Sequence, residues 1–146
     1  MKNFLRSVAS IIVGMVAGFV LIHGIEWVNT LLYPPPPGLD FMDPKQAGAI
    51  QAYFKTLPIQ AFLIVVLAQS LGAFAASWIA ARLANRAKFT HGMIIAALFL
   101  LATLANLASI PHPLWMWFVG PAGVLAAAYL GTRLASGRLM IASPFK

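Results

Sequence analysis

The sequence predicts an all-α integral membrane protein, a four-helix bundle in which each helix spans the bilayer. Of the 146 residues, 61% are hydrophobic and only 9% are charged, whereas a soluble domain has roughly 25% charged residues. The apolar residues fall into four runs, at about 7–32, 58–81, 91–110 and 114–134. Each run approaches the ~20 residues that a helix needs to cross a membrane. We therefore expect residues 1–146 to form a single membrane domain.

The first apolar run predicts a retained span that packs closely on another helix. It is longer than the apolar region of a cleaved signal, which has roughly 7–15 residues. Ser10, Gly14 and Gly18 recur every four residues, and small residues at this spacing let another helix approach. Gly123 and Gly131 belong to a second such pattern in the fourth run. We expect these glycines to pack helices within the chain, with a homodimer seam as the alternative.

Four consecutive prolines, Pro34–Pro37, end the first span. They remove backbone donors and fix φ, so the helix stops and the chain leaves the membrane as a stiff extended arm. The arm opens a Pro-rich outer segment, residues 33–57. Within that segment, residues 44–54 are expected to form a short amphipathic helix that lies in the membrane interface. Its apolar side would comprise Ile50, Tyr53 and Phe54.

The other three spans have clear boundaries in the sequence. The second begins at Pro58, since proline is tolerated in the first helical turn, and it ends at Arg82 and Arg86. The third ends before the Pro-His-Pro turn at residues 111–113, and the fourth ends near Arg133. The chain has no cysteine, which excludes disulfides, thiolate metal sites and thiol catalysis.

The basic residues predict that both termini are cytoplasmic. With both termini on one side, eight of the ten lysines and arginines fall on that side, and basic residues that flank spans stay in the cytoplasm. Trp27, Tyr33, Trp115 and Trp117 then fall near the outer boundary, as an aromatic belt requires. The eight residues are Lys2, Arg6, Arg82, Arg86, Lys88, Arg133, Arg138 and Lys146, and the opposite side has Lys45 and Lys55.

The two halves of the chain also show a faint similarity that predicts a repeat of two helical hairpins. Asn29 precedes Pro34 by the same interval as Asn106 precedes Pro111. Arg-Leu-Ala occurs at the ends of the second and fourth spans. Parallel repeats of this kind occur in some transporters.

Several short motifs resemble those of a widespread group of small four-span bacterial inner-membrane proteins that have no assigned activity. The motifs are His23-Gly-Ile-Glu26, Tyr33-Pro-Pro-Pro-Pro-Gly-Leu-Asp40, Gly72-Ala-Phe, Ala80-Ala-Arg-Leu-Ala84, Asn106 and Ile110-Pro-His-Pro113. The resemblance covers nearly the whole chain and implies a multi-pass protein of the bacterial inner membrane. It implies no catalytic residue, cofactor or substrate.

His23 and Glu26 are the only residues between 7 and 32 that can carry charge, and their spacing places them on one face of the helix. Polar and aromatic residues of the other segments are expected at a similar depth, so we expect all of them to converge on one pocket. The predicted cluster is His23, Glu26, Asn29, Asn106, His112 and Trp115, with Gln60 beside it.

Three interpretations of this cluster remain open. The polar groups form hydrogen bonds that fix helix packing, or Glu26 binds a proton or cation in a permeation site, or His23, Glu26 and His112 hold a metal or tetrapyrrole. The chain has a single glutamate, which is too few for a four-helix di-iron site. It also lacks a nucleophile elbow and a phosphate-binding loop, so the sequence does not favour an enzyme.

We therefore expect a protein that acts by association, as an accessory or structural subunit of an inner-membrane complex. Its partners would be membrane lipids and other membrane subunits, or a second copy of itself. Nucleic acid is not expected despite the net charge of +7, because the basic residues sit at the ends of apolar runs. No cofactor is predicted. The alternative is a small proton- or cation-linked transporter or channel with a site at Glu26.

Overall fold

The computed structural model of the chain describes residues 2–137. Every regular element in this range is helical, and four helices are long and apolar enough to cross a membrane. This confirms the predicted all-α fold and its four candidate spans. The elements are α1 (Lys2–Leu32), the 3₁₀ helix η1 (Pro44–Gln46), α2 (Ala47–Thr56), α3 (Ile59–Leu83), α4 (Lys88–Ser109) and α5 (Met116–Ser136).

The helix ends differ slightly from the predicted ones. α1 begins at residue 2 rather than near 7, and the Arg6 side chain donates a hydrogen bond to the carbonyl of Leu83 at 3.3 Å. The basic segment is thus part of the helix and satisfies a carbonyl at the end of α3. α5 begins only at Met116, because a turn precedes it in which the Met116 amide donates to Pro113 at 3.0 Å. The remaining ends lie within three residues of their predicted positions.

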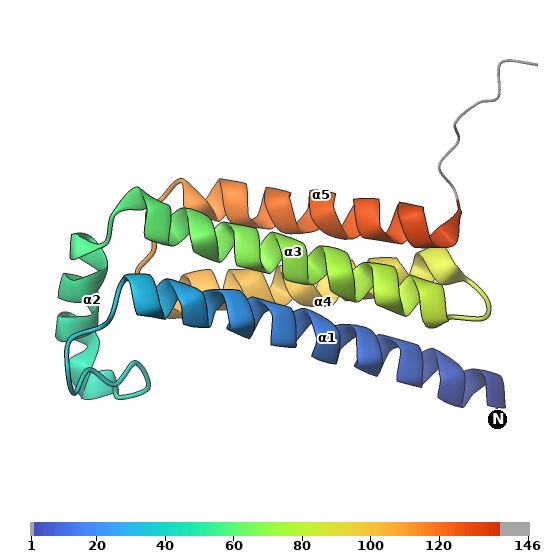
Figure 1. Cartoon of the computed structure of the whole chain (residues 1–146), viewed down its shortest axis with the longest axis horizontal. Coiled ribbons are helices and arrows are strands. Elements are labelled where there is room, and N and C mark those ends of the chain that lie inside the picture. The colour runs from blue at the N-terminus through green and yellow to red at the C-terminus, as the bar shows by residue number, and fades with distance from the viewer. Residues whose placement is uncertain (1, 138–146) are drawn as a thin grey trace, which may run out of the picture.

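α3 is the central helix of the bundle. It packs against α1, α4 and α5, whereas α1 and α5 do not contact each other. Figure 1 shows α3 running between α1 and α5, with α4 behind them. α4 packs extensively on α5 and only sparsely on α1. The predicted two-hairpin repeat stays a prediction.

Glycines on α1 bring its backbone against α3. A Cβ added to Gly14 would lie 2.6 Å from the carbonyl oxygen of Ala76, and one added to Gly18 would lie 2.8 Å from the Ala76 Cβ. On α3, a Cβ at Gly72 would overlap the side chain of Ile22. The first small-residue pattern therefore packs two helices of the same chain.

The second small-residue pattern packs α5 on the other side of α3. A Cβ at Gly131 would overlap the carbonyl of Phe74, and one at Gly123 would lie 2.7 Å from the Ser70 Oγ. The alanines of α3 between these contacts are fully buried. They include Ala68, Ala73, Ala76 and Ala80, each with an exposed fraction of 0%.

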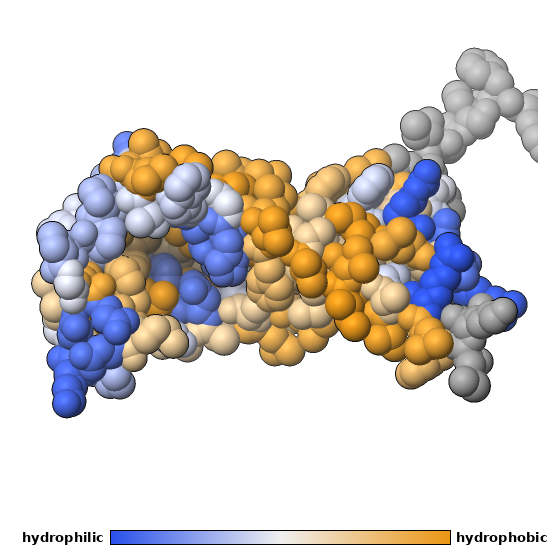
Figure 2. Space-filling view, turned by 60° about the horizontal axis from the view of Figure 1, so that its bottom comes forward, coloured by the Kyte–Doolittle hydropathy of each residue, from blue (hydrophilic) through white to orange (hydrophobic). Residues whose placement is uncertain are grey.

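The molecule has an apolar band between two hydrophilic ends, as Figure 2 shows. The start of α1, the loop between α3 and α4, and the end of α5 lie together at one end. We call this the basic end, and its described basic side chains are Arg6, Arg82, Arg86, Lys88 and Arg133. Arg138 and Lys146, which were also expected here, lie outside the described residues.

The opposite end, here called the capped end, is covered by η1 and α2. The last turn of α1 closes with a hydrogen bond from the Tyr33 amide to the Asn29 carbonyl at 2.9 Å. The prolines that follow direct the chain away from the helix axis. Figure 1 shows α2 running across the end of the bundle. The predicted short helix thus forms as η1 followed by α2. Ile50 is buried on the inner side of α2, while Tyr53 and Phe54 are half-buried.

Enlarging Gly18 is expected to destabilise the bundle, because a larger side chain would push α1 away from α3. Gly18→Leu should lower the free energy of unfolding by about 1–3 kcal/mol. The matched control is Gly24→Leu, since an added Cβ there meets no atom within 4 Å. Unfolding of both variants in mixed detergent micelles checks this. Equal stability of the two variants would contradict the packing described.

Candidate functional site

Two polar pockets occupy the half of the bundle near the capped end. The first lies between α1 and α4, with α3 behind it, and has a volume of about 200 Å³. We call it the α1–α4 pocket. It is lined by Phe19, Ile22, His23 and Glu26 of α1, Gln69 of α3, and Phe99, Ala102, Thr103 and Asn106 of α4.

His23 is oriented by its own helix. Its Nδ1 lies 2.8 Å from the carbonyl oxygen of Phe19. Because a carbonyl only accepts hydrogen bonds, Nδ1 carries the proton and donates it. This bond fixes the orientation of the ring against its own helix.

The Glu26 carboxylate has no hydrogen bond or ion pair among the described residues, and the group that acts on it electrostatically is His23 in the same pocket. The Thr30 hydroxyl, one turn further on, donates to the backbone carbonyl of Glu26 at 3.0 Å and not to its side chain. Glu26 lies six residues before the end of α1, which is about 9 Å along the helix axis. An unpaired carboxylate within the apolar part of a bilayer is unfavourable by several kcal/mol.

Amide side chains complete the α1–α4 pocket. Gln69 is nearly buried, with an exposed fraction of 7%, and Asn106 Oδ1 is buried without a hydrogen-bond partner. The rings of Phe19 and Phe99 stack with their centroids 5.3 Å apart and line the same pocket. The pocket therefore combines unpaired polar groups with an apolar wall.

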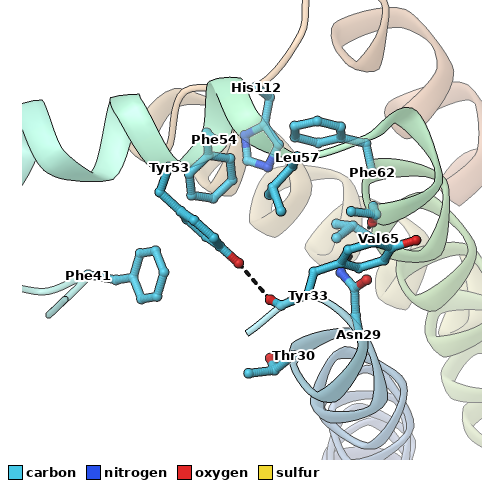
Figure 3. Close-up of a pocket in the computed structure, with 11 residues that line it drawn as sticks. Asn29, Thr30, Tyr33, Phe41, Tyr53, Phe54, Leu57, Phe62, Val65 and His112 are labelled. Carbon is cyan, nitrogen blue, oxygen red and sulfur yellow. Dashed lines mark hydrogen bonds between the residues drawn. The ribbon is translucent and has the colours of Figure 1, made fainter. Parts of the chain in front are cut away.

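The second pocket lies under the cap and has a volume of about 130 Å³. We call it the cap pocket, and Figure 3 shows its lining. The Tyr53 hydroxyl donates to the Tyr33 carbonyl at 2.7 Å, which ties α2 to the end of α1. Asn29 Nδ2 donates to the Ala61 carbonyl at 3.1 Å, which ties α1 to α3. Asn29 Oδ1 is buried and has no partner.

Aromatic contacts hold the cap together. The Phe54 ring contacts those of Phe62 and His112, with centroids 6.2 and 5.8 Å away. His112 Nδ1 donates to the Ile110 carbonyl at 2.8 Å. Desolvation lowers the pKa of His112 below its ordinary value, although the Ile110 bond opposes this shift. Desolvation also raises the pKa of the Tyr53 hydroxyl.

The structure divides the residues that the sequence placed in one cluster. His23, Glu26 and Asn106 meet in the α1–α4 pocket, whereas Asn29 and His112 line the cap pocket. This separation leaves the metal interpretation without a common site for His23, Glu26 and His112. Within residues 2–137, no three histidine, aspartate or glutamate side chains are close enough to hold a metal ion.

Trp115 and the glutamines also differ from the expectation. Trp115 packs against a small apolar cluster that includes Met116, and it lines neither pocket. Gln60 is exposed. Gln69, and not Gln60, lines the α1–α4 pocket. In the sequence, Gln69 follows Ala68 and comes three residues before Gly72, which packs against α1. This spacing places Gln69 on the packed face of the helix and would have predicted its inward position.

Comparisons with known families, curated proteins and solved structures give no match to this chain. The resemblance to small bacterial inner-membrane proteins therefore stays a prediction. A functional proposal for this protein therefore rests on the chemistry of the two pockets.

Protonation of His112 is expected to weaken the cap. Because its pKa is lower in the folded chain than in the unfolded chain, the unfolded chain binds more protons just below the ordinary pKa of about 6.5. Stability is therefore complete above about pH 6.5 and is lost as the pH falls towards the lowered pKa. The free energy of unfolding, measured between about pH 7.5 and about pH 5, checks this prediction.

The control for this prediction is His112→Gln, which cannot titrate. Its stability should fall less over the same acidic range than that of the wild-type chain. Parallel losses in both proteins would show that His112 does not cause the pH dependence.

Proposed function

We propose that this protein acts by association within the membrane, as an accessory or structural subunit of a bacterial inner-membrane complex. The observation that supports this proposal is the unpaired Glu26 carboxylate in the α1–α4 pocket. Because the described residues give it no hydrogen bond or ion pair and only His23 acts on it electrostatically, a group from another molecule would stabilise its charge.

The position of the pocket favours association over transport. It lies between α1 and α4, the pair of packed helices with the least mutual contact, and Figure 2 shows hydrophilic residues reaching into the apolar band near the capped end. Towards the basic end, the core is closely packed, with Ala76, Ala80 and Ile95 fully buried. A group can therefore reach the pocket from the side more readily than through the bundle.

We place the termini and the basic end in the cytoplasm. The described cations at that end come from three separate segments of the chain, and Arg6 and Arg82 are both exposed there. Cations on short segments beside spans remain on the cytoplasmic side. In this orientation, the cap and both pockets belong to the periplasmic half.

Replacing Glu26 is expected to release the partner. The tagged wild-type chain, purified from its own membranes in mild detergent, should elute with a native mass above that of the chain alone and carry defined proteins. Glu26→Gln preserves the shape of the side chain and removes its charge. It should accumulate to the same level, keep its helical content and elute without those proteins.

Asp40→Asn is the matched control, since it removes a carboxylate from the exposed loop before η1. It should retain the partners. A wild-type particle that contains only this chain would contradict the proposal and favour the transporter alternative, which proton flux in liposomes then tests. Retention of the partners by Glu26→Gln would show that another surface makes the association.

A further inference from the structure

The charges near the α1–α4 pocket are unbalanced. Glu26 is the only acidic residue of the four spans, and no described lysine or arginine pairs with it. The described basic residues belong to the two ends of the bundle. A second copy in the same orientation would place its own lysines and arginines at those same depths. Within the described residues, His23 is the group that acts electrostatically on the Glu26 carboxylate, so a lysine or arginine beside it has to come from a different molecule.

The hydrogen-bonding groups of the pocket also suit a cation. The Glu26 carboxylate only accepts hydrogen bonds, and it lies in the same lining as His23, whose Nδ1 proton is donated to the Phe19 carbonyl. Gln69 adds an amide oxygen to the same lining. An ammonium or guanidinium group has several donors and no acceptor, so it complements this set.

The aromatic wall is compatible with the same ligand. Phe19 and Phe99 stack beside the polar groups. Lysine and arginine carry long apolar stems that pack on such surfaces while the charged group reaches a polar site. The face of an aromatic ring also attracts a cation directly.

We propose that the α1–α4 pocket binds a basic side chain carried by a transmembrane helix of another membrane protein. This rests on the proposed function and names the chemistry of the partner. Glu26 lies about 9 Å from the end of α1 along the helix axis, inside the candidate span. Exposed apolar side chains lie beside the pocket on α1, where Val20 and Trp27, three and four residues from His23, have exposed fractions of 67% and 66%. A helix can therefore pack along the groove and deliver its cation sideways.

A designed peptide tests the proposal without knowledge of the natural partner. The peptide is a leucine–alanine transmembrane helix with one lysine about 9 Å from one end of its apolar stretch. The protein has no cysteine, so Gly48→Cys allows labelling at one position. Gly48 is exposed on α2, and an added Cβ there meets no atom within 4 Å. Energy transfer between the two labels in phosphatidylcholine liposomes then measures association.

The lysine peptide is expected to bind the otherwise wild-type chain about tenfold more tightly than the same peptide with leucine in place of lysine. Glu26→Gln should remove this preference, and Asp40→Asn should keep it. Equal binding of the two peptides to the wild-type chain would overturn the proposal, and this comparison requires no substitution in the pocket. Persistence of the preference in Glu26→Gln would overturn it as well.

Two further measurements identify other occupants. Adding phosphatidylethanolamine to the liposomes supplies a lipid ammonium group, and complete loss of lysine-peptide binding in its presence would assign the pocket to the lipid headgroup. Mixing donor-labelled and acceptor-labelled copies of the protein alone tests self-association, and a Glu26-dependent signal would assign the pocket to a second copy. Either result would overturn the proposal.

The peptide experiment tests the chemistry of the pocket, and the purification from native membranes tests the accessory-subunit role. Either claim can be wrong while the other holds. If Glu26 is needed for partners in native membranes but the two peptides bind equally, association remains supported and the basic side chain is wrong. If the peptide preference is present but the native particle contains only this chain, the pocket chemistry remains supported and the accessory-subunit role is wrong.

Discussion

Close backbone contact between α3 and its neighbours α1 and α5 is the constraint on which the rest of the bundle depends. In a bilayer, helices gain little from hydrophobic association, because lipid is as apolar as their side chains. Packing instead requires surfaces that fit closely, and Gly18 and Gly72 provide one between α1 and α3. This contact also sets the rotation of α1. Glu26 lies eight residues after Gly18, about 80° further around the helix, and so it faces the groove beside α4.

Polar side chains from three helices meet in one pocket in the half of the bundle near the cap. Glu26, Gln69 and Asn106 line it, whereas the polar residues buried towards the basic end, such as Ser10 and Thr132, lie in the closely packed core. The pocket opens where α1 and α4 have little contact. The proposed partner helix would supply the hydrogen bonds to Glu26 that lipid does not.

Local features of the sequence determined the main elements of the fold. Four long apolar runs predict four spans because the length of a membrane helix follows from the thickness of the bilayer. The prolines at Pro34–Pro37 predict the end of α1 because they lack backbone donors and fix φ. The glycine spacing around Gly14 and Gly131 predicts close packing because the absence of a Cβ is a local property. None of these inferences requires knowledge of a distant contact.

Which polar residues meet was decided only by the tertiary structure. Gln60 and Gln69 belong to the same helix and are nine residues apart, so they lie on opposite faces, about 180° apart. Packing through Gly72 turns Gln69 inward and leaves Gln60 exposed. Asn29 lies one turn from Glu26, yet its hydrogen bond to Ala61 commits it to the cap pocket. The sequence therefore determined that α1 carries these polar groups, and helix rotation and contact with α3 decided where each one lies.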